Sequence, residues 1–149
     1  MNSDFKDLLR ILNEEKVEYL VAGGYAVIFH SQPRCTKDLD VWIRPSKENA
    51  SKLMRVFKRF GIPMIGGLSE DDFTIVGTQL NLGVEPNQID LLTVIPGLEF
   101  EAAWKNRSTT DEEGFPIHYL GREDTITAKR TAGRFQDLAD IEEIQRLDQ

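Results

Sequence analysis

Two aspartates inside an apolar strand constrain this chain more than any other feature. Asp38 and Asp40 flank Leu39, and Val41 and Ile43 continue the pattern. Alternate residues of a β-strand project to the same face, so the two carboxylates lie side by side while Leu39, Val41 and Ile43 face a core. Two like charges ~4 Å apart repel by about 4 kcal/mol at an effective dielectric near 20, and Asp is uncommon in strands. A divalent cation with oxygen ligands removes this repulsion, so we predict a metal-binding face on this strand.

The alternative is a solvated strand edge. In that interpretation Lys37 and Arg44 provide counter-charges for Asp38 and Asp40, and the pair does no chemistry. The two interpretations differ in what surrounds the pair, because a metal site needs further oxygen ligands.

A glycine pair, Gly23-Gly24, separates a predicted buried strand (residues 17–22) from a predicted short helix (residues 25–30). A helix N-terminus offers free backbone N–H groups and the positive end of the helix dipole, and glycine lets a phosphate approach the backbone closely. The spacing matches neither a P-loop nor a dinucleotide-binding fingerprint. The pair is therefore either a phosphate-binding turn or a simple tight turn.

Asp90 is a single carboxylate within an otherwise apolar strand predicted over residues 88–95. By itself it could be an ion-pair partner or the cap of a strand. If its strand lies beside that of Asp38 and Asp40, the three carboxylates form a two-metal site. Such a site holds the attacking and leaving oxygens of a displacement at phosphorus.

Strands separated by helices and followed by a helical tail indicate an α+β (α/β-like) fold. We expect one domain over residues 1–149, with a small mixed β-sheet flanked by helices, mainly on one side, and a C-terminal helix pair. Strands are predicted over residues 17–22, 39–43, 88–95 and 115–120, with a hairpin formed by 73–77 and 79–83. Helices are predicted over residues 5–12 with Ser3 as N-cap, 25–30, from Ser46 to Gly61, 98–104, 122–133 and 136–147.

Net charge and cysteine content exclude several classes of protein. The net charge of −7 rules out binding of nucleic acid by bulk attraction to phosphates. The single cysteine, Cys35, excludes an internal disulfide and a Cys-cluster zinc site. No apolar run approaches the ~20 residues of a membrane span, and the N-terminus lacks the layout of a signal peptide. We expect a cytoplasmic protein with no membrane partner.

Together these motifs resemble the nucleotidyltransferase superfamily, which has the polymerase-β-like fold. The shared pattern is a glycine pair at a strand–helix junction, 13 intervening residues, Asp-x-Asp on the next strand and a later strand Asp. The resemblance is closer to a short prokaryotic branch with Arg-x-Thr/Ser before the Asp pair, here Arg34-Cys35-Thr36. That layout is shared by abortive-infection-type toxin nucleotidyltransferases and by lincosamide and aminoglycoside nucleotidyltransferases. The tail from Ala128 to Ile141 resembles the Lys…Arg-x-x-Asp-x-x-Asp helix pair of the toxin-like members.

The resemblance implies catalytic and metal-binding roles for Asp38, Asp40 and Asp90, with Mg²⁺ or Mn²⁺ as cofactor. Asp90 would also accept the proton of the acceptor hydroxyl. Gly23 and Gly24 would bind the triphosphate of a nucleoside triphosphate (NTP), the co-substrate.

The resemblance further implies that Arg34, Thr36 and Lys129 lie near the nucleotide, with Lys129 neutralising phosphate charge. Each has a structural alternative: Arg34 as an ion-pair partner of the Asp pair, Thr36 as a loop cap, and Lys129 as a solvated helix residue. Asp137 and Asp140 are expected to be structural, because acidic residues in the first turn of a helix suit its dipole.

Three hypotheses about function follow from the resemblance. The first is a metal-dependent nucleotidyltransferase that moves a nucleoside monophosphate from NTP to a hydroxyl of RNA or protein and releases pyrophosphate. As a toxin-like enzyme it would have a cognate antitoxin-like partner. The second is an antibiotic-type enzyme with a small cationic acceptor, which the net charge of −7 favours. The third is a non-catalytic module that binds nucleotide or a partner protein. The presence of all three aspartates favours an enzyme, while the resemblance does not identify the acceptor.

Overall fold

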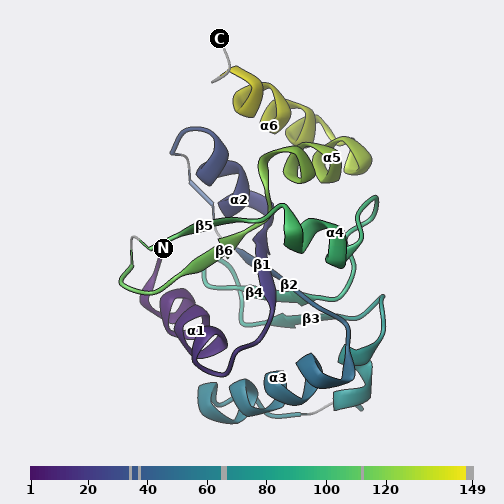
Figure 1. Ribbon diagram of the computed structural model, residues 1–149. Helices are drawn as coiled ribbons and strands as arrows, with labels where there is room; N and C mark the ends of the chain where they lie inside the picture. The colour runs from purple at the N-terminus through teal and green to yellow at the C-terminus, as the bar shows by residue number, and fades with distance from the viewer. Residues whose placement is uncertain (34, 37, 65–66, 112, 147–149) are drawn as a thin grey trace.

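A six-stranded mixed sheet lies between two layers of helices (Figure 1). The computed structural model describes residues 1–33, 35–36, 38–64, 67–111 and 113–146. The strands are β1 (Tyr19–Ala22), β2 (Leu39–Ile43), β3 (Gln79–Leu82), β4 (Ile89–Leu92), β5 (Ser108–Thr110) and β6 (Ile117–Tyr119), in the sheet order β3-β4-β2-β1-β6-β5. The helices are α1 (Ser3–Glu14), α2 (Gly23–His30), α3 (Lys47–Phe60), α4 (Phe100–Lys105), α5 (Arg122–Ala132) and α6 (Phe135–Arg146), with a 3₁₀ helix, η1 (Glu70–Thr74).

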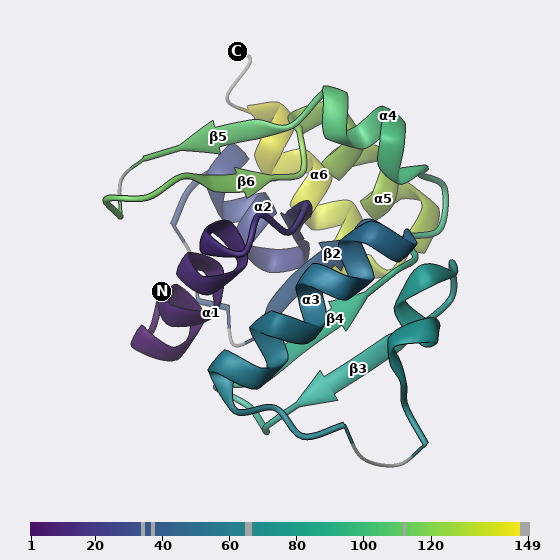
Figure 2. The same cartoon turned by 60° about the horizontal axis from the view of Figure 1, so that its bottom comes forward.

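Helices cover both faces of the sheet, so the expectation of a sheet covered mainly on one side is wrong. Helices α1 and α3 pack on one face, and α2, α4, α5 and α6 lie on the other (Figure 2). Leu39, Val41 and Ile43 of β2 face the first layer, as predicted. Trp42 faces the second layer and is also buried. A strand buried on both faces is an almost continuous apolar run, and β1 and β2 both have this pattern.

Local sequence explains where the first and third helices begin and end. Helix α1 begins one residue earlier than its predicted cap implies. The Asn2 side chain, and not Ser3, accepts the Phe5 N–H at 2.9 Å and is the N-cap. Helix α3 has the predicted boundaries: Ser46 accepts the Asn49 N–H, and Gly61 ends the helix in the left-handed conformation.

The middle of the chain differs from the predicted hairpin. The segment from residue 70 to 74 is the 3₁₀ helix η1, and Phe73 buries its ring against α3. Strand β3 pairs with β4 and not with the segment before it. Strand β5 was not predicted and forms an antiparallel pair with β6. Both errors concern short strands whose partners are chosen by tertiary packing and not by local pattern.

The C-terminal helix pair is held together by a buried group of ion pairs. Lys129 of α5 lies 3.2 Å from both Asp137 and Asp140 of α6. Arg134 donates to Asp137 at 2.7 Å. Because Asp137 and Asp140 are buried, these contacts and not the helix dipole explain their structural role. Lys129 is therefore not a solvated helix residue.

None of the helices in the described ranges has the length and the hydropathy that crossing a membrane requires.

Replacement of Asp137 by Asn should destabilise the protein by about 3 kcal/mol at neutral pH, because it leaves the charge of the half-buried Lys129 partly uncompensated. The hydrogen bond from Arg134, helped by Lys129 and opposed by burial, lowers the pKa of Asp137 to about 2. The stabilisation is therefore present above the unfolded-state pKa and is lost as the pH falls toward 2. Urea unfolding across this pH range measures it. Glu142→Gln, on the exposed side of the same helix, is the control, and equal stability of the two variants would contradict the prediction.

Candidate functional site

Three segments that are far apart in the sequence meet at one edge of the central strands. Strand β1 runs antiparallel to β2, with Ala22 opposite Asp40, so Gly23 follows at this edge. Strand β4 runs parallel to β2, with Asp90 in register with Asp40. The end of β1, the start of β2 and the start of β4 therefore bring together Gly23, Asp40 and Asp90.

A cavity of about 630 Å³ lies over this edge, within the size range of small-molecule sites. Apolar walls come from β4, the segment after it, and α5. Gly23 also lines the cavity, and the polar side chains that line it are those of Asp38, Asp40, Gln79, Asp90, Thr125, Lys129 and Arg134. Three carboxylates and two cationic side chains thus share one cavity, as an anionic substrate bound with a divalent cation would require.

The carboxyl groups of Asp40 and Asp90 lie in hydrogen-bond contact. Burial, first of all, and then the hydrogen bond with Asp90 and the charges of Asp90 and Asp38 together raise the pKa of Asp40 to about 7. The positive charge of Lys129 opposes the shift. A proton shared near neutral pH is the expected response of two carboxyls brought together without a cation.

Gly23 is required by the position of the Asp40 carboxylate. The glycine has φ +60°, which disfavours other residues, and a Cβ built on it would lie 1.9 Å from Oδ2 of Asp40. The sequence analysis explained the glycine by phosphate approach. The structure adds a second reason, since only a residue without a side chain leaves room for the aspartate.

Gln88 is a site residue that the sequence analysis did not single out. Its Nε2 donates to Oδ1 of Asp90 at 2.8 Å. Gln88 precedes Asp90 by two residues and so lies on the same side of the chain, a signal that was available from strand periodicity. The hydrogen bond orients the Asp90 carboxyl toward the cavity edge that it shares with Asp40.

The predicted nucleotide-binding residues are only partly brought together. Lys129 lines the cavity. Gly24 is the second residue of α2, and Thr36 is half-buried in the loop before β2; neither is among the described residues that line the cavity. Arg34 lies outside the described residues, so its predicted role remains a prediction.

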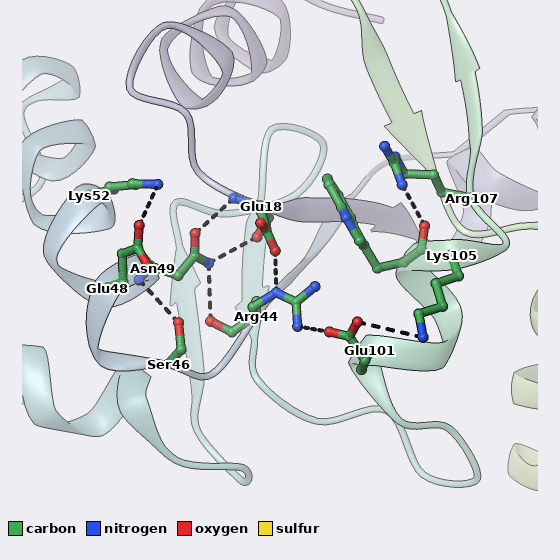
Figure 3. A network of polar contacts seen from close by, with 10 residues as sticks. Glu18, Arg44, Ser46, Glu48, Asn49, Lys52, Glu101, Lys105 and Arg107 are labelled. Carbon is green, nitrogen blue, oxygen red and sulfur yellow. Dashed lines mark hydrogen bonds and ion pairs between the residues drawn. The ribbon is translucent and has the colours of Figure 1, made fainter.

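The alternative interpretation of the Asp pair as a solvated edge required Arg44 as a counter-charge. Instead Arg44 binds Glu18 and Glu101 (Figure 3). The other proposed counter-charge, Lys37, lies outside the described residues. The part of this interpretation that depends on Arg44 is therefore wrong, and the part that depends on Lys37 remains a prediction.

The donor set fits a divalent cation, although it does not form a finished three-ligand centre. Within the described ranges no group of three or more His, Cys, Asp or Glu side chains is arranged to hold a metal ion. Asp40 and Asp90 nevertheless present carboxylate oxygens in direct contact, which are the ligands that Mg²⁺ and Mn²⁺ prefer. Asp38 lines the same cavity. Metal binding by these residues remains a prediction.

Comparison with solved structures identifies the fold. The lincomycin-bound crystal structure of the lincosamide antibiotic adenylyltransferase LnuA superposes with a TM-score of 0.59 at 17% identity, covering 97% of this chain and 96% of that one. An antigenic nucleotidyltransferase-like protein from Paracoccidioides brasiliensis has a TM-score of 0.60 at 20% identity, covering 95% and 73%. A Thermotoga maritima protein described as a nucleotidyltransferase has a TM-score of 0.55 at 16% identity, covering 97% and 88%. The chain has the nucleotidyltransferase fold.

The sequence itself gives no closer assignment. No protein-family model matches it, and no curated protein matches it. The structural neighbours show the fold that the motifs indicated, and at 16–20% identity they show nothing beyond the fold. The narrower resemblance to abortive-infection-type toxins remains a hypothesis.

Replacement of Gly23 by Ala should weaken Mg²⁺ binding by at least about tenfold, because the Asp40 carboxylate must move away from the new methyl group. Gly114→Ala is a matched control. Gly114 has φ +83° but has open space around its Cβ position, so it reports backbone strain without the contact. Calorimetric Mg²⁺ titration and thermal melting of both variants make the measurement. Equal Mg²⁺ affinity of the two variants would show that Gly23 does not protect the carboxylate position.

Mg²⁺ binding without nucleotide should depend on pH. Because the pKa of Asp40 is raised to about 7, a proton competes with the cation below that pH. Affinity should rise about tenfold per pH unit up to neutrality and level off above it. Titration calorimetry in two buffers of different ionisation enthalpy should also detect the released proton. Asp71→Asn, in η1, should keep the wild-type profile, and an affinity independent of pH would refute the shared proton.

Proposed function

We propose that the chain is a nucleotidyltransferase that uses Mg²⁺ or Mn²⁺ to move a nucleoside monophosphate from NTP to an acceptor hydroxyl, with release of pyrophosphate. The contact between Asp40 and Asp90, beside Gly23 and Lys129 in one cavity, is the observation that carries this proposal. Two carboxyls in contact, one of them buried and the other half-buried, reduce stability when no cation is bound, and they can hold a cation that binds a triphosphate.

Each side chain then has a part in an in-line displacement. Asp40 and Asp90, with Asp38, would hold the metal, whose chemistry here is to neutralise the triphosphate and polarise its α-phosphate. Lys129, which lines the cavity, would stabilise the negative charge of the phosphates. The acceptor oxygen forms a bond to the α-phosphorus as the bond to the β-phosphate oxygen breaks. Asp90 accepts the hydroxyl proton, and pyrophosphate leaves.

The finer part of the proposal concerns the acceptor and the partner. RNA or protein as acceptor, together with a cognate antitoxin-like protein, rests on the resemblance of the tail to toxin-like enzymes. Its Lys, Arg and Asp residues form the ion pairs that join α5 to α6. The alternative of a non-catalytic module is opposed by the shared cavity, because a module that binds only nucleotide has no need of Asp90 beside Asp40.

Replacement of Asp90 by Asn separates binding from chemistry. The amide keeps the shape of the side chain but cannot accept a proton. NTP binding in Mg²⁺ should therefore be largely retained, while transfer should fall by at least ~10²-fold. The protein is incubated with Mg²⁺, each α-labelled NTP and cell extract, and labelled products are separated into small molecules, RNA and protein. Asp71→Asn is the control for loss of an exposed carboxylate. Wild-type rates in Asp90→Asn would show that Asp90 is only structural.

A further inference from the structure

Strand β3 forms one edge of the sheet, and within the described ranges no strand pairs with its outer side (Figure 2). The pairing of β3 with β4 determines which of its backbone groups face outward. The Thr93 N–H donates to the Thr78 carbonyl oxygen at 2.9 Å, so Thr78 and every second residue after it bond inward to β4. The backbone N–H and C=O groups of Gln79 and Asn81 therefore point outward, where no described residue bonds to them.

This edge lacks the features that usually keep sheet edges from pairing with another chain. Charged side chains and proline are common protections of an edge strand. Residues 73–84 contain neither, although 29% of the residues of the whole chain are charged. The opposite edge strand, β5, has three residues and lies directly between Arg107 and Asp111. Of the two edges, that of β3 is therefore the better suited to pairing with a further strand.

The sequence of this edge is complementary to itself. Two copies of β3 in antiparallel pairing, with a twofold axis at Leu80, place Gln79 of one copy opposite Asn81 of the other. These outward-facing residues can then exchange backbone hydrogen bonds, and their side-chain amides lie on the same face of the joined sheet. Leu80 lies opposite Leu80 of the second copy. One symmetric contact thus pairs the open edge of both copies.

Exposed valines extend the contact beyond the ends of β3. Val76 is 67% exposed and Val84 is 77% exposed. Counted outward from the axis at Leu80, Val76 of one copy lies level with Val84 of the other, so apolar side chains meet across the interface. Val76 also lines a second cavity, of about 350 Å³, beside Trp42, and Gln79 lines the cavity of the three carboxylates. The second copy would therefore border both cavities.

We propose that the chain forms a homodimer through β3, in which two six-stranded sheets join into one continuous sheet with Leu80 at the twofold axis. The inference does not depend on the transfer reaction. One short strand pair and its flanking valines bury less than the roughly 1,200 Å² of a standard interface, so the dimer forms at micromolar concentration. Each copy carries a net charge of −7. Because salt screens the repulsion between the copies, association strengthens as the ionic strength rises.

Sedimentation velocity over a range of protein concentrations measures this association. The sedimentation coefficient should rise from that of a monomer to that of a dimer, and the dissociation constant should fall when NaCl is added. Val84→Glu should weaken association by at least about tenfold, because it places a carboxylate in the apolar contact with Val76. Leu138→Glu makes the same change of charge at an exposed position of α6 and should not. A monomer at every concentration, or equal weakening by the two variants, would overturn the inference.

A cysteine cross-link tests the position of the axis. Leu80→Cys, in a Cys35→Ser background, brings two thiols together in a pair without backbone hydrogen bonds. Its Cα atoms are about 4.5 Å apart, a separation that a disulfide spans. Air oxidation should give a cross-linked dimer on non-reducing electrophoresis. Leu82→Cys, which lies on the same face of β3 but opposite Thr78 of the second copy, should stay monomeric. Absence of a cross-link in Leu80→Cys at dimer-forming concentration would refute the proposed pairing.

Discussion

The contact between two carboxyl groups, on Asp40 and Asp90, is the interaction around which this end of the structure is organised. Parallel pairing of β2 and β4 places the two residues in register, so their side chains lie next to each other on the same face of the sheet. Burial of this contact disfavours ionisation of the Asp40 carboxyl group, as its raised pKa shows. Three neighbouring residues accommodate the pair. Gly23 gives the Asp40 carboxylate space, Gln88 donates a hydrogen bond to Asp90, and Lys129 contributes positive charge.

Strand periodicity allowed the position and orientation of the acidic residues in β2 to be predicted from the sequence. The alternation of acidic and apolar residues assigned both boundaries of β2 and the face of Asp40 correctly. It could not show that β4 lies next to β2, because strand pairing across about 50 residues depends on packing of the whole sheet. The wrong hairpin and the missed β5 have the same origin. Gln88 and Trp42 were overlooked because neither residue type indicates a site without its neighbours.

The two aspartates of the last helix, Asp137 and Asp140, are structural as predicted, but for a different physical reason. Asp137 and Asp140 were expected to be structural because they begin a helix. They are structural because Lys129 and Arg134 reach them, and Lys129 belongs to the preceding helix. Lys129 also lines the carboxylate cavity. The same ammonium therefore joins two helices and contributes to the potential felt by a phosphate, so its position over the cavity depends on α6 although α6 contributes little to the cavity wall.

The two faces of β2 have different surroundings: one packs in the core, and the other lines the cavities. Leu39, Val41 and Ile43 lie wholly in the core beneath α1 and α3, where a change of volume acts on folding. On the opposite face, Asp40 and then Trp42 follow one another along the strand, so a charged surface passes into an aromatic one within two residues. A strand with period two supplies both on one rigid element, and the buried opposite face keeps that element in place.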